Sequence, residues 1–232
     1  PNATIRYTID GNEPTGASLL YNGPVTIPTT KVLKAISISP DPQVLTSLMR
    51  FDTYFINVSH TLPIVSVSAT SLTNLANGNG SLEPHGALEY FDTAGVRQAK
   101  TYGRFNKHGQ DSWVLSQRSL DFAARDEMGY NYTIKEQLFA TTTRDEFQKI
   151  ILRASGDDNY PADHNNANAG SAHMRDAYVH MLAKNGGMNL DVRTAAKCIV
   201  YLNGAYWGVY DIRDNPDDHD YTNYYYGQDK YH

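Results

Sequence analysis

Cysteine, surplus positive charge and long apolar runs are all scarce or missing in this sequence of 232 residues. Cys198 is the only cysteine, which excludes an intrachain disulfide and a metal site built from several thiolates. Because 20 lysines and arginines stand against 25 aspartates and glutamates, the net charge of −5 provides no basic field for nucleic acid or an anionic membrane. No apolar run approaches the roughly 20 residues that a membrane-spanning helix requires. We therefore expect no nucleic-acid partner and no membrane span.

The residues that are abundant indicate a globular protein rich in β-structure. Apolar residues make up 41% of the chain, which is enough for a sizeable core, and charged residues only 19%. Tyrosine occurs 17 times, beside many asparagines, threonines and serines. This composition is typical of extracellular or cell-surface proteins, so we expect that location. Cys198 lies in an apolar segment, and we predict that it is an inert core residue.

The clearest local signal is a β-hairpin near the end of the chain. Cys198–Leu202 is apolar and strand-like, Asn203-Gly204 is the strongest two-residue turn signal, and Tyr206–Ile212 is aromatic and β-branched. Five aspartates follow between positions 211 and 220, which is too acidic for a simple continuation of the strand. The sequence therefore predicts that polar groups are arranged at this strand end.

Short strands separated by Pro, Gly and Asn turns fill the first 60 residues, which indicates an antiparallel β-sandwich of the immunoglobulin or fibronectin-III type. Three strings resemble the chitobiase C-terminal or fibronectin-III-like modules of secreted bacterial carbohydrate-active enzymes: Ile5–Thr15, Leu20–Val25 and Val32–Ile36. The resemblance covers residues 1–59 and implies one or two strands upstream of them. We therefore expect an incomplete sandwich, truncated at its start, whose open edge is covered by the next domain or a neighbour.

A second unit is predicted for residues 60–232, opened by the buried-looking strand Leu62–Ser68. Further strands are expected at 87–91, 99–105, 118–124 and 146–153, with a short helical turn at 136–139. Ser171–Lys184 carries spaced apolar residues and is followed by Gly186-Gly187, which predicts the principal helix of the chain. The predicted fold class is α+β, with an antiparallel sheet and one principal helix after the incomplete sandwich.

Five strings of this second unit, taken in order, resemble the CotH (spore coat protein H) kinase-like family. They are Leu62–Val67, Gly109–Phe122, Ile151–Asp158, Arg175–Ala177 and Leu202–Tyr210. The string Asn-Gly-x-Tyr-Trp-Gly-Val-Tyr is the most specific of them. The resemblance implies an atypical protein-kinase fold that binds ATP and Mg²⁺ and phosphorylates serine or threonine of surface or coat proteins.

The resemblance also implies three residues that bind the cofactor. The strand after the Gly109-x-x-Ser112 turn commonly carries lysine in the family, so Arg118 is the candidate cation for the nucleotide phosphates, with Ser112 as a second candidate. After the hairpin, relatives show Arg-Glu where this chain has Arg213-Asp214, and Asp214 is the candidate partner of Arg118. A surface arginine and a solvated acidic loop are the alternative interpretations.

The resemblance places no catalytic residue with confidence within these 232 residues. In the family, the base and the main Mg²⁺ carboxylate lie beyond the matched strings, so we expect a second unit truncated at its end and inactive by itself. The alternative hypothesis is a non-catalytic surface adhesion or scaffold protein, or a carbohydrate-binding one. Convergence of Arg118 and Asp214 in a cleft would favour the kinase-like hypothesis, and separate solvent faces would favour the structural one.

Two clusters suggest metal sites. Asp157, Asp158 and Asp163 lie in one loop, as carboxylates that bind Ca²⁺ often do, but their spacing does not fit the EF-hand pattern and a hydrogen-bonded loop is favoured. His173 and His180 are seven residues apart on the predicted helix and hence on one face of it. Zinc is the weaker hypothesis there, because no third ligand appears at a convincing spacing.

Two other groups have structural and functional interpretations. Arg175 and Asp176 are predicted to form a structural ion pair beneath the strand that carries Arg153. Aromatic residues gather at Tyr206, Trp207, Tyr210, Tyr221, Tyr224, Tyr225 and Tyr226. They are suited to stacking on sugars, although an aromatic core explains them equally well, and only a solvent-facing row would favour sugar binding.

Overall fold

The computed structural model describes residues 2–159, 170–217 and 219–229. The predicted α+β class is confirmed, with mostly antiparallel strands and few helices. The strands are β1 (Thr4–Thr8), β2 (Leu19–Leu20), β3 (Lys31–Ile38), β4 (Arg50–Tyr54), β5 (Ile64–Ser68), β6 (His85–Phe91), β7 (Arg97–His108), β8 (Ser119–Arg125), β9 (Ile134–Lys135), β10 (Glu146–Phe147), β11 (Lys149–Arg153), β12 (Ala195–Leu202) and β13 (Ala205–Asp214). The helices are α1 (Leu72–Ala76), α3 (Arg175–Asn185) and α4 (His219–Tyr226), with 3₁₀ turns η1 (Asp111–Val114) and η2 (Gly156–Asp158).

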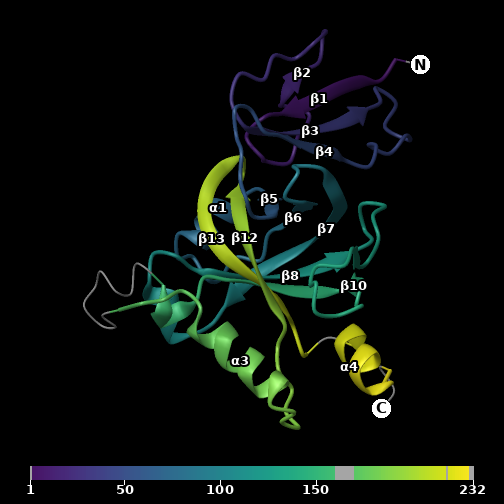
Figure 1. Cartoon of the computed structure of the whole chain (residues 1–232). Coiled ribbons are helices and arrows are strands. Elements are labelled where there is room, and N and C mark those ends of the chain that lie inside the picture. The colour runs from purple at the N-terminus through teal and green to yellow at the C-terminus, as the bar shows by residue number, and fades with distance from the viewer. Residues whose placement is uncertain (1, 160–169, 218, 230–232) are drawn as a thin grey trace.

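The first unit is one antiparallel sheet of four strands in the order β2-β1-β3-β4. Figure 1 shows this sheet lying across one end of the second unit. Met49, immediately before β4, and Phe51 of β4 form a buried cluster with Ala87 of β6 and Tyr102 of β7. The second unit therefore supplies the layer that covers this sheet.

Polar groups also hold the two units together. The Lys34 side chain is completely buried and donates to Glu13 Oε1 at 2.7 Å and to the Ser68 carbonyl at 3.0 Å. Thr53 of β4 donates to Glu89 Oε2 of β6 at 2.6 Å. Because buried polar groups are costly unless they are hydrogen-bonded, these contacts fix one orientation between the units.

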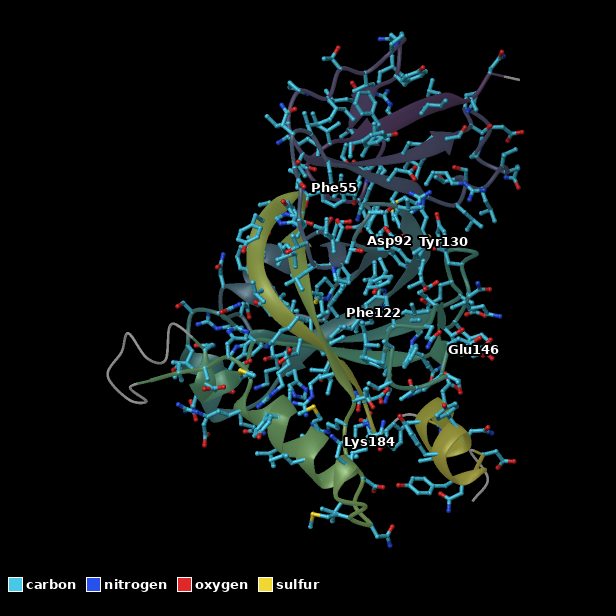
Figure 2. All side chains as sticks on the ribbon, in the orientation of Figure 1. Phe55, Asp92, Phe122, Tyr130, Glu146 and Lys184 are labelled. Atoms are coloured by element: carbon cyan, nitrogen blue, oxygen red, sulfur yellow. The ribbon has the colours of Figure 1, made fainter. Side chains whose placement is uncertain are left out.

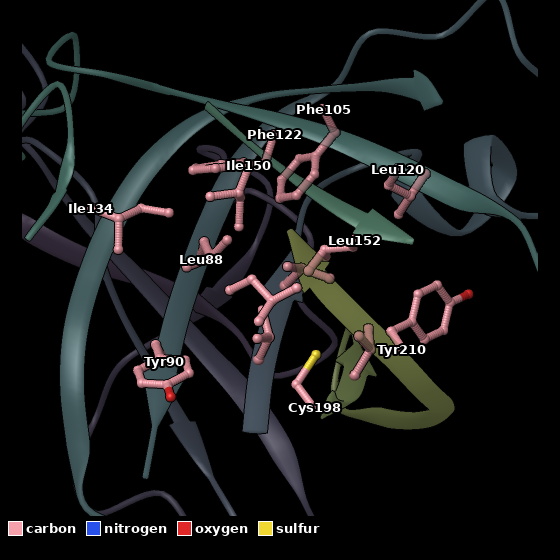
Figure 3. Packing of buried hydrophobic residues seen from close by; sticks show 14 of the residues in the cluster. Leu88, Tyr90, Phe105, Leu120, Phe122, Ile134, Ile150, Leu152, Cys198 and Tyr210 are labelled. Carbon is pink, nitrogen blue, oxygen red and sulfur yellow. The ribbon is translucent and has the colours of Figure 1, made fainter. Parts of the chain in front are cut away.

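The second unit is a closed barrel of seven strands in the order β11-β13-β12-β5-β6-β7-β8. All neighbours are antiparallel except β5 and β12, whose parallel pairing the sequence did not predict. The interior is filled by apolar side chains such as Phe122, Leu152 and Tyr210, with Cys198 among them (Figure 3). Burial raises the pKa of the Cys198 thiol, which fits its predicted role as an inert core residue.

The predicted hairpin is formed by β12 and β13. Asn203 and Gly204 at its tip have φ values of 52° and 82°, as a turn with two left-handed residues requires. The second strand extends two residues beyond the predicted Ile212, because Arg213 and Asp214 pair with β11 and are buried. The acidic segment that begins at Asp211 therefore starts within strand β13 and not after the strand has ended.

The helices differ most from the sequence predictions. The principal helix begins at Arg175, four residues after the predicted start. Segment 136–139 forms no helical turn, since Leu138 and Phe139 enter the core as extended chain. Helix α1 was not predicted, because its sequence is polar apart from the residues that face the core: Leu72, Leu75 and Ala76.

Candidate active site

An ion cluster joins two barrel strands to the principal helix. Asp176 in the first turn of α3 lies 2.8 Å from Arg153 Nε of β11 and also accepts a hydrogen bond from Arg213 of β13. Burial alone would raise the pKa of the Asp176 carboxyl, but the two arginines outweigh it and hold that pKa below its ordinary value. The predicted pairing of Arg175 with Asp176 is therefore wrong: Asp176 pairs with Arg153 and Arg213, whereas Arg175 pairs with Asp158.

This cluster carries more positive than negative charge. Arg213 is almost fully buried, and burial lowers its pKa although Asp176 opposes that shift. Its Nε and Nη2 atoms are buried without a hydrogen-bond partner among the described residues. Unsatisfied guanidinium donors in a buried position are costly, so the partly exposed Arg153 is the arginine of this cluster that an anion can reach.

A cationic groove adjoins the cluster. It has a volume of about 420 Å³ between α3 and the start of β12, and Lys184, Arg193 and Lys197 line it with a single acid, Asp211. Figure 2 shows Lys184 on α3 at this side of the barrel. Lys197 and Asp211 are paired at 2.7 Å, which leaves two positive charges in excess. This side of the barrel attracts anionic ligands.

Arg118 is committed to backbone groups. Its guanidinium donates to the Trp113 carbonyl at 2.7 Å and to the Ala76 carbonyl at 3.3 Å, which ties the η1 loop to the end of α1. Because these hydrogen bonds use Nε and Nη1 of Arg118, fewer of its donors remain for a phosphate, and its role as a phosphate-binding cation stays a prediction.

Asp214 does not pair with Arg118, and this part of the prediction is wrong. Asp214 is fully buried, and its Oδ1 accepts from Arg144 Nη1 at 2.9 Å while its Oδ2 accepts from Tyr225 at 3.2 Å. Asp214 lies opposite Ile150, which lies opposite Phe122, four residues along β8 from Arg118. At about 3.3 Å per residue the two residues are offset by about 13 Å along the strands, and two strand spacings of about 4.8 Å each add to that separation. The convergence that would have favoured the kinase-like hypothesis at these two residues is absent.

The remaining cofactor candidate, Ser112, lies in the loop that joins β7 to β8. Ser112 is in η1 and lies next to Gly156 of η2. A Cβ built on Gly156 would lie 3.4 Å from the Cβ of Ser112. Gly109 opens this loop with a φ of 98°, a conformation that favours glycine. The loop therefore packs against the segment that leads from β11 to α3, and its cofactor role stays a prediction.

The acidic loop proposed for Ca²⁺ serves a different purpose. Asp158 accepts hydrogen bonds at 2.8 Å from the backbone N–H groups of Ala172, Met174 and Arg175, at the start of α3. Burial raises the pKa of its carboxyl, but these N–H groups and Arg175 reverse the shift and lower it. Asp157 is exposed, and Asp163 lies outside the described residues. The favoured hydrogen-bonded loop matches this geometry.

The two histidines do not share a helix face. His173 lies two residues before α3 with a φ of 55°, because Asp158 holds the backbone there in a turn. His180 accepts from the Arg193 backbone N–H at 3.1 Å through Nδ1. No group of three metal-ligating side chains occurs within the described ranges, so the structure offers no support for a zinc site there.

The aromatic residues divide between core and surface. Tyr201, Tyr210 and Tyr221 are buried, whereas Tyr206 and Tyr226 are more than half exposed on different elements. These aromatic side chains therefore do not form the solvent-facing row that would favour sugar binding.

Three features of these clusters were not predicted from the sequence: Arg144, Arg193 and the pairing of Arg213 with Asp176. Arg213 offered a weak signal, since an arginine inside an apolar strand needs a buried partner. Arg144 stands in a Thr-rich segment with no pattern that distinguishes it from a surface residue.

Comparison with known families gives two matches. The chitobiase/β-hexosaminidase C-terminal domain model matches residues 1–45, and the CotH kinase protein model matches residues 105–230. The second match spans β8, β11, α3, β12 and β13, which carry the ion cluster. No curated protein matches the chain. No described helix is long and apolar enough to cross a membrane.

Proposed function

The chain belongs to the CotH kinase family, and from that premise we propose that it holds the phosphates of ATP for transfer to serine or threonine of a protein substrate. We further propose an extracellular or cell-surface location, in keeping with the tyrosine-rich, weakly charged composition. The ion cluster of Arg153, Asp176 and Arg213 is the proposed phosphate-orienting centre.

The observation that carries this proposal is the position of the Arg153–Asp176 pair. Counted along the barrel from β7, β11 is the third strand, and α3 is the helix that follows it in the chain. In protein kinases a cation on the third strand pairs with an acid on the following helix, and the pair must be in place for the cation to hold the nucleotide phosphates. Arg153 on β11 and Asp176 on α3 have this relation at 2.8 Å.

The loop between β7 and β8 supports the same proposal. In protein kinases the loop between the first two strands covers the phosphates. Here that loop contains Gly109 and Ser112, and it packs against Gly156 between β11 and α3. Ser112 is therefore proposed to contact a phosphate from above the cluster.

The described residues fit the phosphates but do not by themselves form a Mg²⁺ site. Two arginines share one carboxylate, so the cluster keeps an excess positive charge that a phosphate would balance. ATP would supply the phosphoryl group, while Arg153 and Arg213 would orient it and balance its charge. Within the described ranges no three metal-ligating side chains gather, so we derive no step through the ion.

Isothermal titration with ATP tests the proposal without requiring turnover. We expect saturable binding, and Arg153→Met should weaken it at least tenfold, because a charge-assisted contact to phosphate is lost. Arg175→Met is the matched control: it removes the same charge at the first residue of α3, where Arg175 pairs with Asp158 at 3.3 Å. Circular dichroism confirms that both variants are folded. Equal ATP affinity in wild type and Arg153→Met would overturn the assignment.

A further inference from the structure

Helix α3 presents its large apolar side chains to solvent. Figure 1 shows the helix lying along the outside of the barrel, and none of its residues 175–185 is buried. The side of α3 that meets the strands is polar, since Asp176 pairs there with Arg153. Five large apolar residues in α3 or directly before it are between 48% and 62% exposed: Met174, Tyr178, Val179, Met181 and Leu182. A surface helix ordinarily turns its apolar stripe to the core, so this arrangement indicates an interaction surface.

The exposed apolar residues of α3 form one continuous arc. Because successive residues of an α-helix are rotated by about 100°, Met181, Tyr178, Leu182 and Val179 follow one another around about 160° of its circumference. Asp176 lies outside this arc, on the side of the barrel. The helix has 11 residues and is therefore about 16 Å long. An apolar surface of this extent fits a segment of another protein better than a small molecule.

Part of this arc forms a wall of the cationic groove. Met174, Tyr178 and Met181 line the groove from α3, at the spacing of three and four residues that places side chains on one helix face. Residues 194–197, at the start of β12, also line it. Methionine adapts its shape to irregular apolar partners, and tyrosine buries a large ring. The groove therefore offers an adaptable apolar wall to the side chains of a ligand.

The charge of the groove determines which partner fits it. Lys184 and Arg193 line the groove, and neither forms an ion pair with a residue that the structure describes. Lys197 is neutralised by Asp211 at 2.7 Å. Two unpaired cations beside an apolar wall complement carboxylates that lie next to apolar side chains. A second copy of this chain is disfavoured, because a two-fold contact through this face would bring the same cations together.

We propose that the groove beside α3 docks an acidic segment of a partner protein. Large apolar side chains of the segment lie on Tyr178 and Met181, and its carboxylates lie on Lys184 and Arg193. The apolar contacts supply affinity, as they do where an amphipathic segment lies in a groove, and the charges exclude basic partners. The inference does not depend on the proposed phosphate-binding function, because it uses the outer side of α3 and not the ion cluster beneath the helix.

A synthetic peptide tests this surface in the unmodified protein. The probe is a fluorescein-labelled peptide with leucine at positions i, i+3, i+4 and i+7 and glutamate elsewhere, and its fluorescence anisotropy is measured. We expect saturable binding with a Kd on the order of 100 µM. One control peptide replaces leucine by serine and another replaces glutamate by glutamine, and each should bind at least tenfold more weakly. Absence of binding by the probe, or equal binding by either control peptide, refutes the proposal.

Matched variants locate the docking site. Lys184→Met removes a cation but keeps an apolar side chain, and Tyr178→Ala removes a ring that is 48% exposed, so both proteins should fold, which circular dichroism checks. Each change should weaken peptide binding at least fivefold. Lys135→Met and Tyr132→Ala alter similarly exposed residues outside the groove and should bind the peptide as the wild type does. Equal affinity within either matched pair contradicts the assignment.

Two further measurements separate the acidic segment from other occupants of the groove. Sedimentation velocity should show a monomer in the absence of peptide. A dimer that Tyr178→Ala dissociates would refute the proposal, because a second copy would then cover this face. Saturating ATP should leave the peptide bound, whereas complete displacement would assign the groove to the nucleotide and also refute it.

Discussion

Replacing Arg144 by methionine should lower the free energy of unfolding by about 3 kcal/mol at pH 7, because it leaves a buried carboxylate without its cation. The Arg144 side chain is 2% exposed and that of Asp214 is 0% exposed, with 2.9 Å between Nη1 and Oδ1. A pair this deeply buried belongs to the class in which removal of one partner costs about 3–5 kcal/mol. Because Tyr225 still donates a hydrogen bond to Asp214 in the variant, we expect a loss of stability at the lower end of this range.

The pH dependence of this loss identifies the group responsible. Burial raises the pKa of Asp214, and Arg144 partly opposes that effect, so its removal raises the pKa further. For a carboxyl whose folded pKa is raised, protonation favours the folded state, so stability increases as the pH falls through that pKa. The loss caused by Arg144→Met should therefore be largest at pH 7 and shrink in acid. It should be independent of pH when Asp214 is also changed to Asn.

Urea denaturation of Arg144→Met, Asp214→Asn and the double variant gives the coupling energy between the two side chains. We expect a coupling energy between Arg144 and Asp214 of about 2 kcal/mol or more. A parallel cycle with Arg118→Met and Asp214→Asn should give a value near zero, since residues more than about 10 Å apart act additively. The reasoning fails if Arg118 couples to Asp214 and Arg144 does not, or if Arg144→Met costs less than about 1 kcal/mol.

Three further predictions concern other parts of the fold. Cys198 should not react with Ellman's reagent in the native protein and should react fully in guanidinium, because the thiol is buried and its pKa is raised. Gly11→Ala should destabilise the protein by at least twice as much as Gly95→Ala in calorimetry: both have φ near 80°, but only at Gly11 would a Cβ lie 2.5 Å from another residue, Asn203. Asp158→Asn should cost about 1–3 kcal/mol at pH 7 by denaturation, and that difference should shrink below about pH 4, since the lowered pKa of Asp158 stabilises the fold only while it is ionised.

Local signals account for the elements that the sequence predicted well. The Asn203-Gly204 turn requires two left-handed residues and determines the hairpin around it, and short apolar runs such as Leu62–Ser68 define the strands. Local patterns do not determine which strands become neighbours. The parallel pairing of β5 with β12 closes the barrel across about 130 residues of chain, and nothing near either strand specifies it.

The candidate site shows the same limit. Asp176 and Arg153 could be singled out from the sequence, but the choice between Arg175 and Arg213 as a partner depends on how α3 crosses the barrel. The family pattern suggested Arg118 for Asp214, whereas the segment that precedes β10 brings Arg144 to Asp214 instead. A charged residue finds its partner through tertiary packing, and spacing along the chain carries little information about it.

The tip of the β12–β13 hairpin connects the first unit to a strand that carries part of the ion cluster. Asn203 accepts from the Ala69 backbone N–H at 3.0 Å, Gly11 lies against Asn203, and Gly204 lies against Lys31. The tip of β12 and β13 is therefore one of the places where the first unit contacts the second directly, in addition to Lys34 and the cluster around Phe51. The same β13 carries Arg213 at its far end. One strand of the barrel thus joins the contact with the first unit at its start to the ion cluster at its end.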